Sequence, residues 1–130
     1  MSKKTMALWG AQVLLAAVFA LAGFMKATQP IPDLAAMMGW PGEVPVALVR
    51  FIGAAELAAA AGLILPVLTG IMPRLTALAA LGLATIQVLA MGLHIYRGEL
   101  EVLPVNAVLL ALAVYVILGR RTSRSVPATA

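Results

Sequence analysis

Four long stretches of this sequence are almost free of charge, and they limit what the chain can fold into. The stretches are Ala7–Met25, Phe51–Pro73, Leu75–Tyr96 and Val102–Gly119. Together they contain a single Asp, Glu, Lys or Arg, which is Glu56. An apolar run of about 18 or more residues is typical of a transmembrane helix, because about 20 residues at 1.5 Å each cross the hydrocarbon core of a bilayer. The pattern therefore predicts four membrane-spanning helices.

The composition agrees with this prediction. Hydrophobic residues make up 63% of the chain and charged residues 11%, whereas a soluble domain carries about 25% charged residues. The apolar runs do not alternate with polar residues, which excludes transmembrane β-strands. We predict an all-α bundle of four transmembrane helices with antiparallel neighbours, forming one integral membrane domain over residues 1–130. The expected spans are 7–27, 46–68, 75–96 and 102–118, with an interfacial outer loop at 28–45 and a disordered tail at 122–130.

The charged residues, with a net charge of +4, predict the orientation of the spans. If the spans alternate in direction, one side carries only basic residues: Lys3, Lys4, Arg74, Arg120, Arg121 and Arg124. The opposite side mixes both signs: Lys26, Asp33, Glu43, Arg50, Arg97, Glu99 and Glu101. Because cytoplasmic loops are enriched in Lys and Arg, we predict that both the N- and the C-terminus are cytoplasmic. The lipid bilayer explains the basic excess, so no nucleic-acid partner is expected.

A cleavable signal peptide is an alternative for the first span. Lys3 and Lys4 precede an apolar stretch that contains Ala20-Leu21-Ala22, a small-residue cleavage pattern. The apolar core of a signal peptide is usually about 7–15 residues long, and the stretch here is longer. Three further spans also follow it. We therefore favour an ordinary first helix, although the sequence leaves cleavage after Ala22 open.

Several kinds of chemistry are excluded by residue content. The chain has no cysteine and a single histidine, His94. Thiol redox chemistry, iron–sulfur ligation and cysteine zinc sites are therefore excluded. Metal sites with two or three histidines cannot form within one chain. We expect no metal site and no intrinsic cofactor.

A few polar side chains lie within or beside the apolar runs. Helices in lipid associate through small residues and interhelical hydrogen bonds. Gly23 lies about one turn from Lys26, and Gly53 about one turn from Glu56. The helix rise places most of the polar groups in the outer half of the bundle, with Gln87 near the midplane. The candidate ligand-binding or proton-exchange residues are Lys26, Arg50, Glu56, Gln87, His94, Arg97 and Asn106.

Glu56 is the most informative of these residues, because a carboxylate in hydrocarbon must be paired or protonated. Lys26 is its best expected partner, since its long stem can bend down from the end of the first span, and His94 is the second. Arg50 is expected to point to another face and to extend outward or pair with a loop acid. Glu56 is then either a structural latch or a proton or ligand site. For His94 we favour a hydrogen-bonded residue at the headgroup boundary.

The polar residues and the motifs around them also carry a resemblance. The relevant stretches are Ala22-Gly23 with Lys26, Arg50–Glu56, Gly62–Pro66, Pro73–Thr76, and His94 with Arg97 and Glu99. In these stretches the chain resembles the DoxX-like family of small bacterial membrane proteins. The resemblance implies a compact four-helix bundle in the inner membrane. Members of the wider group are linked to quinone-dependent sulfur oxidation and to membrane complexes that handle oxidative stress.

Three functional hypotheses follow. The leading one is a redox-associated membrane subunit that holds a small hydrophobic ligand, such as a quinone, beside Glu56 and His94, with Lys26 tuning Glu56. A membrane or soluble redox enzyme would supply the electrons, so any enzymatic role is that of an accessory subunit of a quinone-linked oxidoreductase. The second hypothesis is a non-catalytic scaffold that assembles a partner. The third is a minimal transporter subunit that forms its path as a homo-oligomer.

Overall fold

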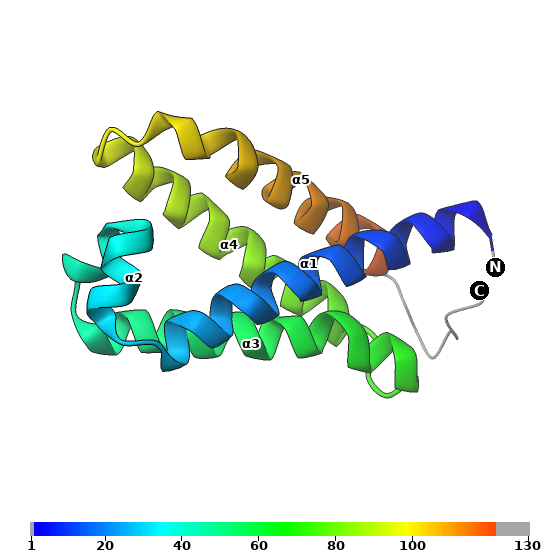
Figure 1. Ribbon diagram of the computed structural model, residues 1–130. Coiled ribbons are helices and arrows are strands. Elements are labelled where there is room, and N and C mark those ends of the chain that lie inside the picture. The colour runs from blue at the N-terminus through cyan, green and yellow to red at the C-terminus, as the bar shows by residue number, and fades with distance from the viewer. Residues whose placement is uncertain (1, 122–130) are drawn as a thin grey trace.

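The computed structural model describes residues 2–121, and the regular secondary structure in this part of the chain is entirely helical, without strands (Figure 1). The elements are α1 (Lys3–Thr28), α2 (Ile31–Met38), the 3-10 helix η1 (Trp40–Gly42), α3 (Val46–Thr69), α4 (Leu75–Tyr96), the 3-10 helix η2 (Leu100–Val102) and α5 (Leu103–Arg120). Four segments are long and apolar enough to cross a membrane: α1, α3, α4 and Leu100–Arg120. The predicted all-α bundle of four spans is therefore confirmed. The predicted disordered tail, residues 122–130, lies outside the described residues.

The surface of the spans is apolar, as a lipid-facing surface must be. Large hydrophobic side chains are exposed on each span, for example Leu21 at 65%, Phe51 at 68%, Leu89 at 69% and Val105 at 63%. Soluble monomers rarely expose continuous apolar patches larger than a few hundred Å². The protein is therefore a multi-pass membrane protein.

Helix ends fall where the sequence has turn-forming residues. Pro32 lies in the first turn of α2, and Gly39 ends that helix with a φ of 80°. Gly70 ends α3 in the left-handed conformation, with a φ of 75°, which glycine adopts without steric strain. Pro104 lies in the first turn of α5, where the missing N–H is not needed. We call the end with α2 and the α4–α5 turn the outer end, and the end with the α3–α4 turn the inner end.

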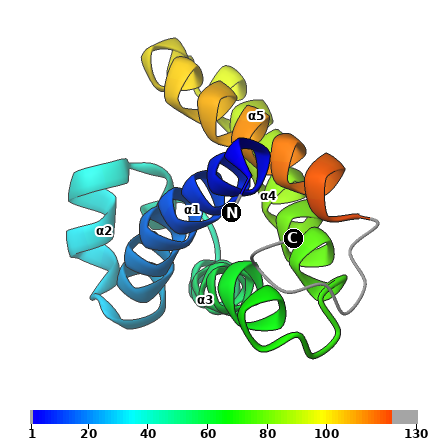
Figure 2. The ribbon, with the colours of Figure 1, turned by 90° about the vertical axis from the view of Figure 1, so that its right-hand side faces the viewer.

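The buried core lies at the inner end and the middle of the bundle. It consists of Ala11, Leu15, Phe19, Leu63, Ala80, Leu83, Ala84, Ala113 and Val116. Gln87 is the last buried residue of α4, and Ala113 is the first buried residue of α5. Toward the outer end, the α4–α5 hairpin diverges from the α1–α3 pair (Figures 1 and 2). The outer halves of α4 and α5 are therefore less tightly enclosed than the inner halves.

Glycines allow α1 and α3 to meet backbone to backbone near the outer end. A Cβ atom on Gly53 would lie 2.6 Å from the Ala27 nitrogen, and one on Gly23 would lie 2.7 Å from the Gly53 carbonyl oxygen. Small residues permit such close approach of helices in lipid. This crossing brings the last turn of α1 against the first half of α3, where the charged candidate residues lie.

A proline in α3 is compensated by a hydroxyl of α4. Pro66 lies inside α3, and it has no N–H to donate to the carbonyl of Gly62, four residues earlier. The Thr76 Oγ1 donates a hydrogen bond to that carbonyl oxygen at 2.9 Å. Thr76 is fully buried. The hydroxyl therefore supplies the donor that the helix lacks and joins α3 to α4 near the inner end.

We expect Thr76→Val to lower the free energy of unfolding by about 1–2 kcal/mol, because the Gly62 carbonyl then has no donor. In a Pro66→Ala background, the alanine N–H can bond that carbonyl, so the same change should have little effect. The free energy of unfolding is measured by chemical unfolding in micelles for the wild type, the two single variants and the double variant. Thr85→Val is the control, since the exposed Thr85 hydroxyl bonds its own helix. Equal losses in the two backgrounds would contradict the compensation.

Candidate functional site

A buried ion pair joins α1 to α3 next to the glycine crossing. Lys26 Nζ lies 2.9 Å from Glu56 Oε1, and the two side chains are 11% and 3% exposed. The pairing expected from the sequence is confirmed. One carboxylate oxygen is bonded, whereas Oε2 makes no hydrogen bond to any residue in the described range 2–121. The pair therefore fixes the two helices and still has unused hydrogen-bonding capacity.

Arg50 caps the carboxyl end of α1. Its Nη1 donates to the carbonyl oxygens of Lys26 at 3.0 Å and Gln29 at 2.6 Å. The last carbonyls of a helix lack intrahelical partners and carry partial negative charge, so a cation there is favourable. Of the two expectations for Arg50, pairing with a loop acid was wrong, because its acceptors are backbone carbonyl oxygens at the outer end of α1. The glycine crossing brings the end of α1 within reach of the half-buried guanidinium and supplies carbonyl acceptors instead.

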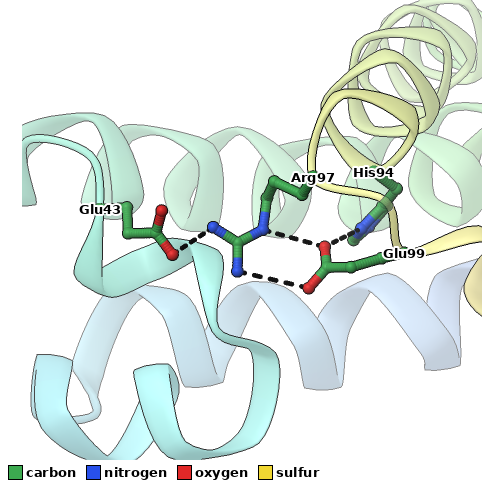
Figure 3. Close-up of polar contacts among 4 residues, drawn as sticks. All are labelled: Glu43, His94, Arg97 and Glu99. Carbon is green, nitrogen blue, oxygen red and sulfur yellow. Dashed lines mark hydrogen bonds and ion pairs between the residues drawn. The ribbon is translucent and has the colours of Figure 1, made fainter.

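A second polar network lies at the outer end, in the turn between α4 and α5 (Figure 3). His94 Nδ1 lies 2.9 Å from Glu99 Oε1, and Arg97 Nε donates to the same oxygen at 3.0 Å. Arg97 also donates from Nη2 to Glu99 Oε2 at 3.3 Å and from Nη1 to Glu43 of the outer loop. The favoured interpretation of His94, a boundary histidine bonded to a neighbour, is confirmed. Its expected second role as a partner of Glu56 is wrong, because the α4–α5 hairpin carries it away from α3.

This network holds the outer loop against the α4–α5 turn. Hydrogen bonds from Arg97 first, and then from His94, lower the pKa of Glu99 below its ordinary value of 4.5. The bonds to Glu99 and Glu43 raise the pKa of Arg97 above its ordinary value. Gly39 leaves room for this arginine, because a Cβ there would lie 2.7 Å from Arg97 Nη2.

We expect the outer loop to loosen in acid. Because folding lowers the pKa of Glu99, its stabilising effect is present above pH 4.5 and is lost as the pH falls through the lower folded value. Hydrogen exchange of residues 31–43 should therefore accelerate between about pH 5 and pH 3 beyond the intrinsic pH dependence. Glu99→Gln is the comparison that isolates the contribution of Glu99. An identical acid response in wild type and Glu99→Gln would refute the assignment.

Two buried amides on the α4–α5 hairpin have no partner. The Oε1 atom of Gln87 and the Nδ2 atom of Asn106 are buried without a hydrogen bond to any described residue. Gln87 is 4% exposed, and an unsatisfied buried polar group destabilises a protein by about 1–3 kcal/mol. Gln87 lies on the buried face of α4, in line with the core residues Ala80 and Leu83. The sequence identified both amides as candidates, and the structure shows that the bundle itself leaves them unsatisfied.

Gln87 lies at nearly the same depth as the ion pair. A Cβ on Gly62 would lie 2.8 Å from the Ala79 Cβ, so these two residues face each other across antiparallel α3 and α4. Counting outward from this contact places Gln87 within about one helical turn, 5.4 Å, of the depth of Glu56. Asn106 is three residues from the start of α5, near the outer end. Unsatisfied polar atoms thus occur at two depths in the outer half.

A third network at the inner end was not among the candidate sites. Gln12 Nε2 donates to the Leu63 carbonyl oxygen at 2.6 Å, and Arg120 Nε donates to Gln12 Oε1 at 2.7 Å. The Arg120 guanidinium lies 5.7 Å from the centroid of the Trp9 ring. Reasoning from the sequence treated Arg120 as one of several residues that set orientation. The sequence held one indication of this contact. Arg120 lies at the end of an apolar span, at a depth similar to that of the polar residue Gln12 in another span.

Two other features bear on ligand binding. In residues 2–121, no group of three His, Cys, Asp or Glu side chains lies close enough to hold a metal ion. An apolar groove between α4 and α5 is lined by Leu81, Ala84, Thr85, Val88, Leu89, Leu110, Val114 and Ile117. Most of these side chains are exposed on the lipid-facing side. The groove therefore fits an acyl chain of the surrounding bilayer better than a polar ring.

Comparison with protein families identifies the chain. The model of the DoxX-like family matches residues 10–116. The chain belongs to the DoxX-like family. Comparisons with curated proteins and with solved structures found no significant match. In this DoxX-like protein, the matched region contains all the candidate residues of the outer half, whereas Trp9 and Arg120 of the inner network lie outside it.

Proposed function

We propose that this DoxX-like protein is a redox-associated subunit of the bacterial inner membrane that binds a small quinone-like molecule. The ligand would lie in the outer half, between the α1–α3 pair and the α4–α5 hairpin. The observation that carries the proposal is the pair of unpartnered amide atoms, Gln87 Oε1 and Asn106 Nδ2. Their positions on a membrane-embedded hairpin favour a ligand that is apolar overall and has a few hydrogen-bonding atoms.

The chemistry of the amides fits both redox states of such a ring. An amide N–H of Asn106 can donate to a quinone carbonyl, and the Gln87 carbonyl can accept a hydrogen bond from a quinol hydroxyl. The Oε2 atom of Glu56 is the site for a transferred proton, with Lys26 compensating the carboxylate charge. The side chains of this protein include no group that transfers electron pairs to a quinone. A partner redox enzyme would therefore supply the electrons.

Binding is tested with decyl-ubiquinone as the probe. The protein is titrated in nanodiscs, and quenching of Trp40 fluorescence is followed in a Trp9→Phe background. We expect saturable quenching that Gln87→Leu and Asn106→Leu each weaken about tenfold, as the loss of one hydrogen bond of about 1.4 kcal/mol predicts. The matched control is Thr85→Val, which lies in the lipid-facing groove of α4. Non-saturable quenching, or equal affinity in all four proteins, would overturn the proposal.

The same leucine variants separate binding from structure. Gln87→Leu removes an unsatisfied buried amide, so we expect it to unfold at a temperature equal to or higher than that of the wild type. A variant that binds the quinone more weakly while being at least as stable has lost a ligand contact. A large loss of stability would instead identify Gln87 as a structural residue.

A non-catalytic scaffold is the second candidate, and the ion pairs between elements of the chain favour it. The Lys26–Glu56 pair and the Arg97 network join elements of this chain to each other, as in a rigid support for a partner. On this hypothesis, Glu56→Gln would reduce recovery of a co-purifying protein without changing quinone binding. Mass spectrometry of the purified wild type for bound quinone and for bound protein decides between the two candidates, and cross-linking in the membrane tests for a homo-oligomer.

A further inference from the structure

The inner end holds a buried cation that forms no ion pair with any residue in the described range 2–121. Arg120, the last residue of α5, is 5% exposed. Its Nε is bonded to Gln12, which is itself bonded to the backbone of α3, and its guanidinium lies against the Trp9 ring. Both groups that contact the guanidinium lie on α1, and Gln12 is in turn held by α3. They provide a neutral acceptor and an aromatic face, and neither neutralises the charge.

No acidic side chain of this chain can take that role. The sequence has five acidic residues: Asp33, Glu43, Glu56, Glu99 and Glu101. All of them belong to the outer loop, the α4–α5 turn or the outer half of α3. The described charged residues at the inner end are basic: Lys3, Lys4, Arg74, Arg120 and Arg121. A buried charge without a partner is strongly unfavourable, so an anion from outside the described residues 2–121 would stabilise the inner end.

Unused hydrogen-bond donors show where such an anion binds. Arg120 Nη2 and Trp9 Nε1 are both buried without a partner among residues 2–121. Arg120 Nη1 likewise makes no hydrogen bond to a described residue. The two terminal nitrogens of a guanidinium match two oxygens of a phosphate group. Because both donors are buried, the half-buried Trp9 ring must move to admit the anion.

The helix packing places this site at the membrane boundary. Gly119 lets α5 approach α1 closely, because a Cβ there would clash with the side chain of Leu8. The start of α1 and the end of α5 therefore lie side by side (Figures 1 and 2). Lys3, Lys4 and Arg121 are exposed around this end and attract anionic headgroups. Arg120 ends the apolar segment Leu100–Arg120, and phospholipid headgroups lie where such membrane-spanning segments end.

We propose that Arg120 and Trp9 form a phosphate-binding site between α1 and α5, occupied in the membrane by an anionic phospholipid headgroup. This site is separate from the proposed quinone site and does not depend on it. Its ligand is recognised by the phosphate diester and the negative charge, and the acyl chains lie along the apolar sides of α1 and α5.

The test measures lipid retention and stability of the full chain. Nanodiscs of phosphatidylcholine alone are compared with discs that contain phosphatidylglycerol, and retained lipids are counted by native mass spectrometry. We expect the wild type to retain phosphatidylglycerol and to unfold at a temperature several degrees higher in the anionic discs. A parallel titration with inorganic phosphate in neutral detergent identifies the source. A shift with phosphatidylglycerol alone supports the headgroup, and an equal shift with phosphate overturns the assignment to lipid.

Two variants with the same loss of charge show whether the site is specific. Arg120→Gln should abolish the retained phosphatidylglycerol and the thermal shift, whereas Arg121→Gln, the exposed neighbour, should keep both. Arg120→Lys keeps the positive charge but lacks the two terminal nitrogens that pair with two phosphate oxygens. We therefore expect it to retain phosphatidylglycerol about tenfold more weakly. If Arg120→Gln fails to fold, the wild type alone still tests the proposal in the two kinds of disc. The proposal is overturned if the wild type retains no phosphatidylglycerol and unfolds at the same temperature in both. Equal losses in Arg120→Gln and Arg121→Gln would indicate a diffuse basic surface and would also overturn it.

Discussion

Replacing Lys26 with methionine is expected to lower the free energy of unfolding by about 3–5 kcal/mol, because removing one partner of a buried ion pair leaves the other charge uncompensated. The Glu56 side chain is 3% exposed and has no other hydrogen-bond donor among the described residues. Methionine keeps the length and the apolar stem of lysine, so the change isolates the ammonium group. Chemical unfolding in mixed micelles measures the loss.

The double variant Lys26→Met with Glu56→Met is the decisive comparison. It removes both charges, and apolar replacement of a whole buried pair is often neutral or stabilising. We therefore expect the double variant to recover most of the stability that the single variant loses. Lys4→Met, an exposed lysine of the same helix, should change stability by less than about 0.5 kcal/mol. A double variant as unstable as Lys26→Met would show that the two charges are not coupled.

Gly53→Ala is expected to lower the free energy of unfolding by about 3 kcal/mol, at the upper end of the usual effect of overpacking. The added Cβ would lie 2.6 Å from the Ala27 nitrogen and 2.8 Å from the Gly23 carbonyl oxygen. Both are backbone atoms, so the helices must separate to admit the methyl group. That separation also stretches the Lys26–Glu56 pair, which lies beside the crossing.

Gly82→Ala provides the matched control in α4. A Cβ there meets nothing within 4 Å, and alanine is favoured over glycine in a helix by about 0.5–1 kcal/mol. We therefore expect Gly82→Ala to be neutral or stabilising under the conditions that unfold Gly53→Ala. Thermal unfolding followed by circular dichroism measures both. Similar stabilities for the two variants would contradict the close crossing of α1 and α3.

The spans and the central ion pair could be predicted from the sequence because each follows from a local rule. Hydrocarbon tolerates few charges, so charge-free runs locate the helices. Lys26 and Glu56 have opposite charges at similar depth, and each lies about one turn from a glycine. Those two facts suffice to predict that they meet.

The partners of Arg50, His94 and Arg120 could not be predicted because they depend on how the helices cross. Arg50 finds carbonyl oxygens, which every residue has and which no sequence pattern distinguishes. His94 bonds to Glu99 within its own turn, since the α4–α5 hairpin diverges from α3. Arg120 meets Gln12 across 108 residues of sequence, and only the contact of α1 with α5 brings them together.

The divergence of the two helix pairs has a consequence for how a guest molecule arrives. Because the pairs separate within the hydrocarbon, the proposed quinone-like ligand would reach its site sideways from the bilayer. Its occupancy is then governed by its mole fraction in the lipid rather than by its concentration in water. Dissociation constants for this ligand, determined in discs of different lipid content, should agree only when they are expressed as the mole fraction of ligand in the lipid.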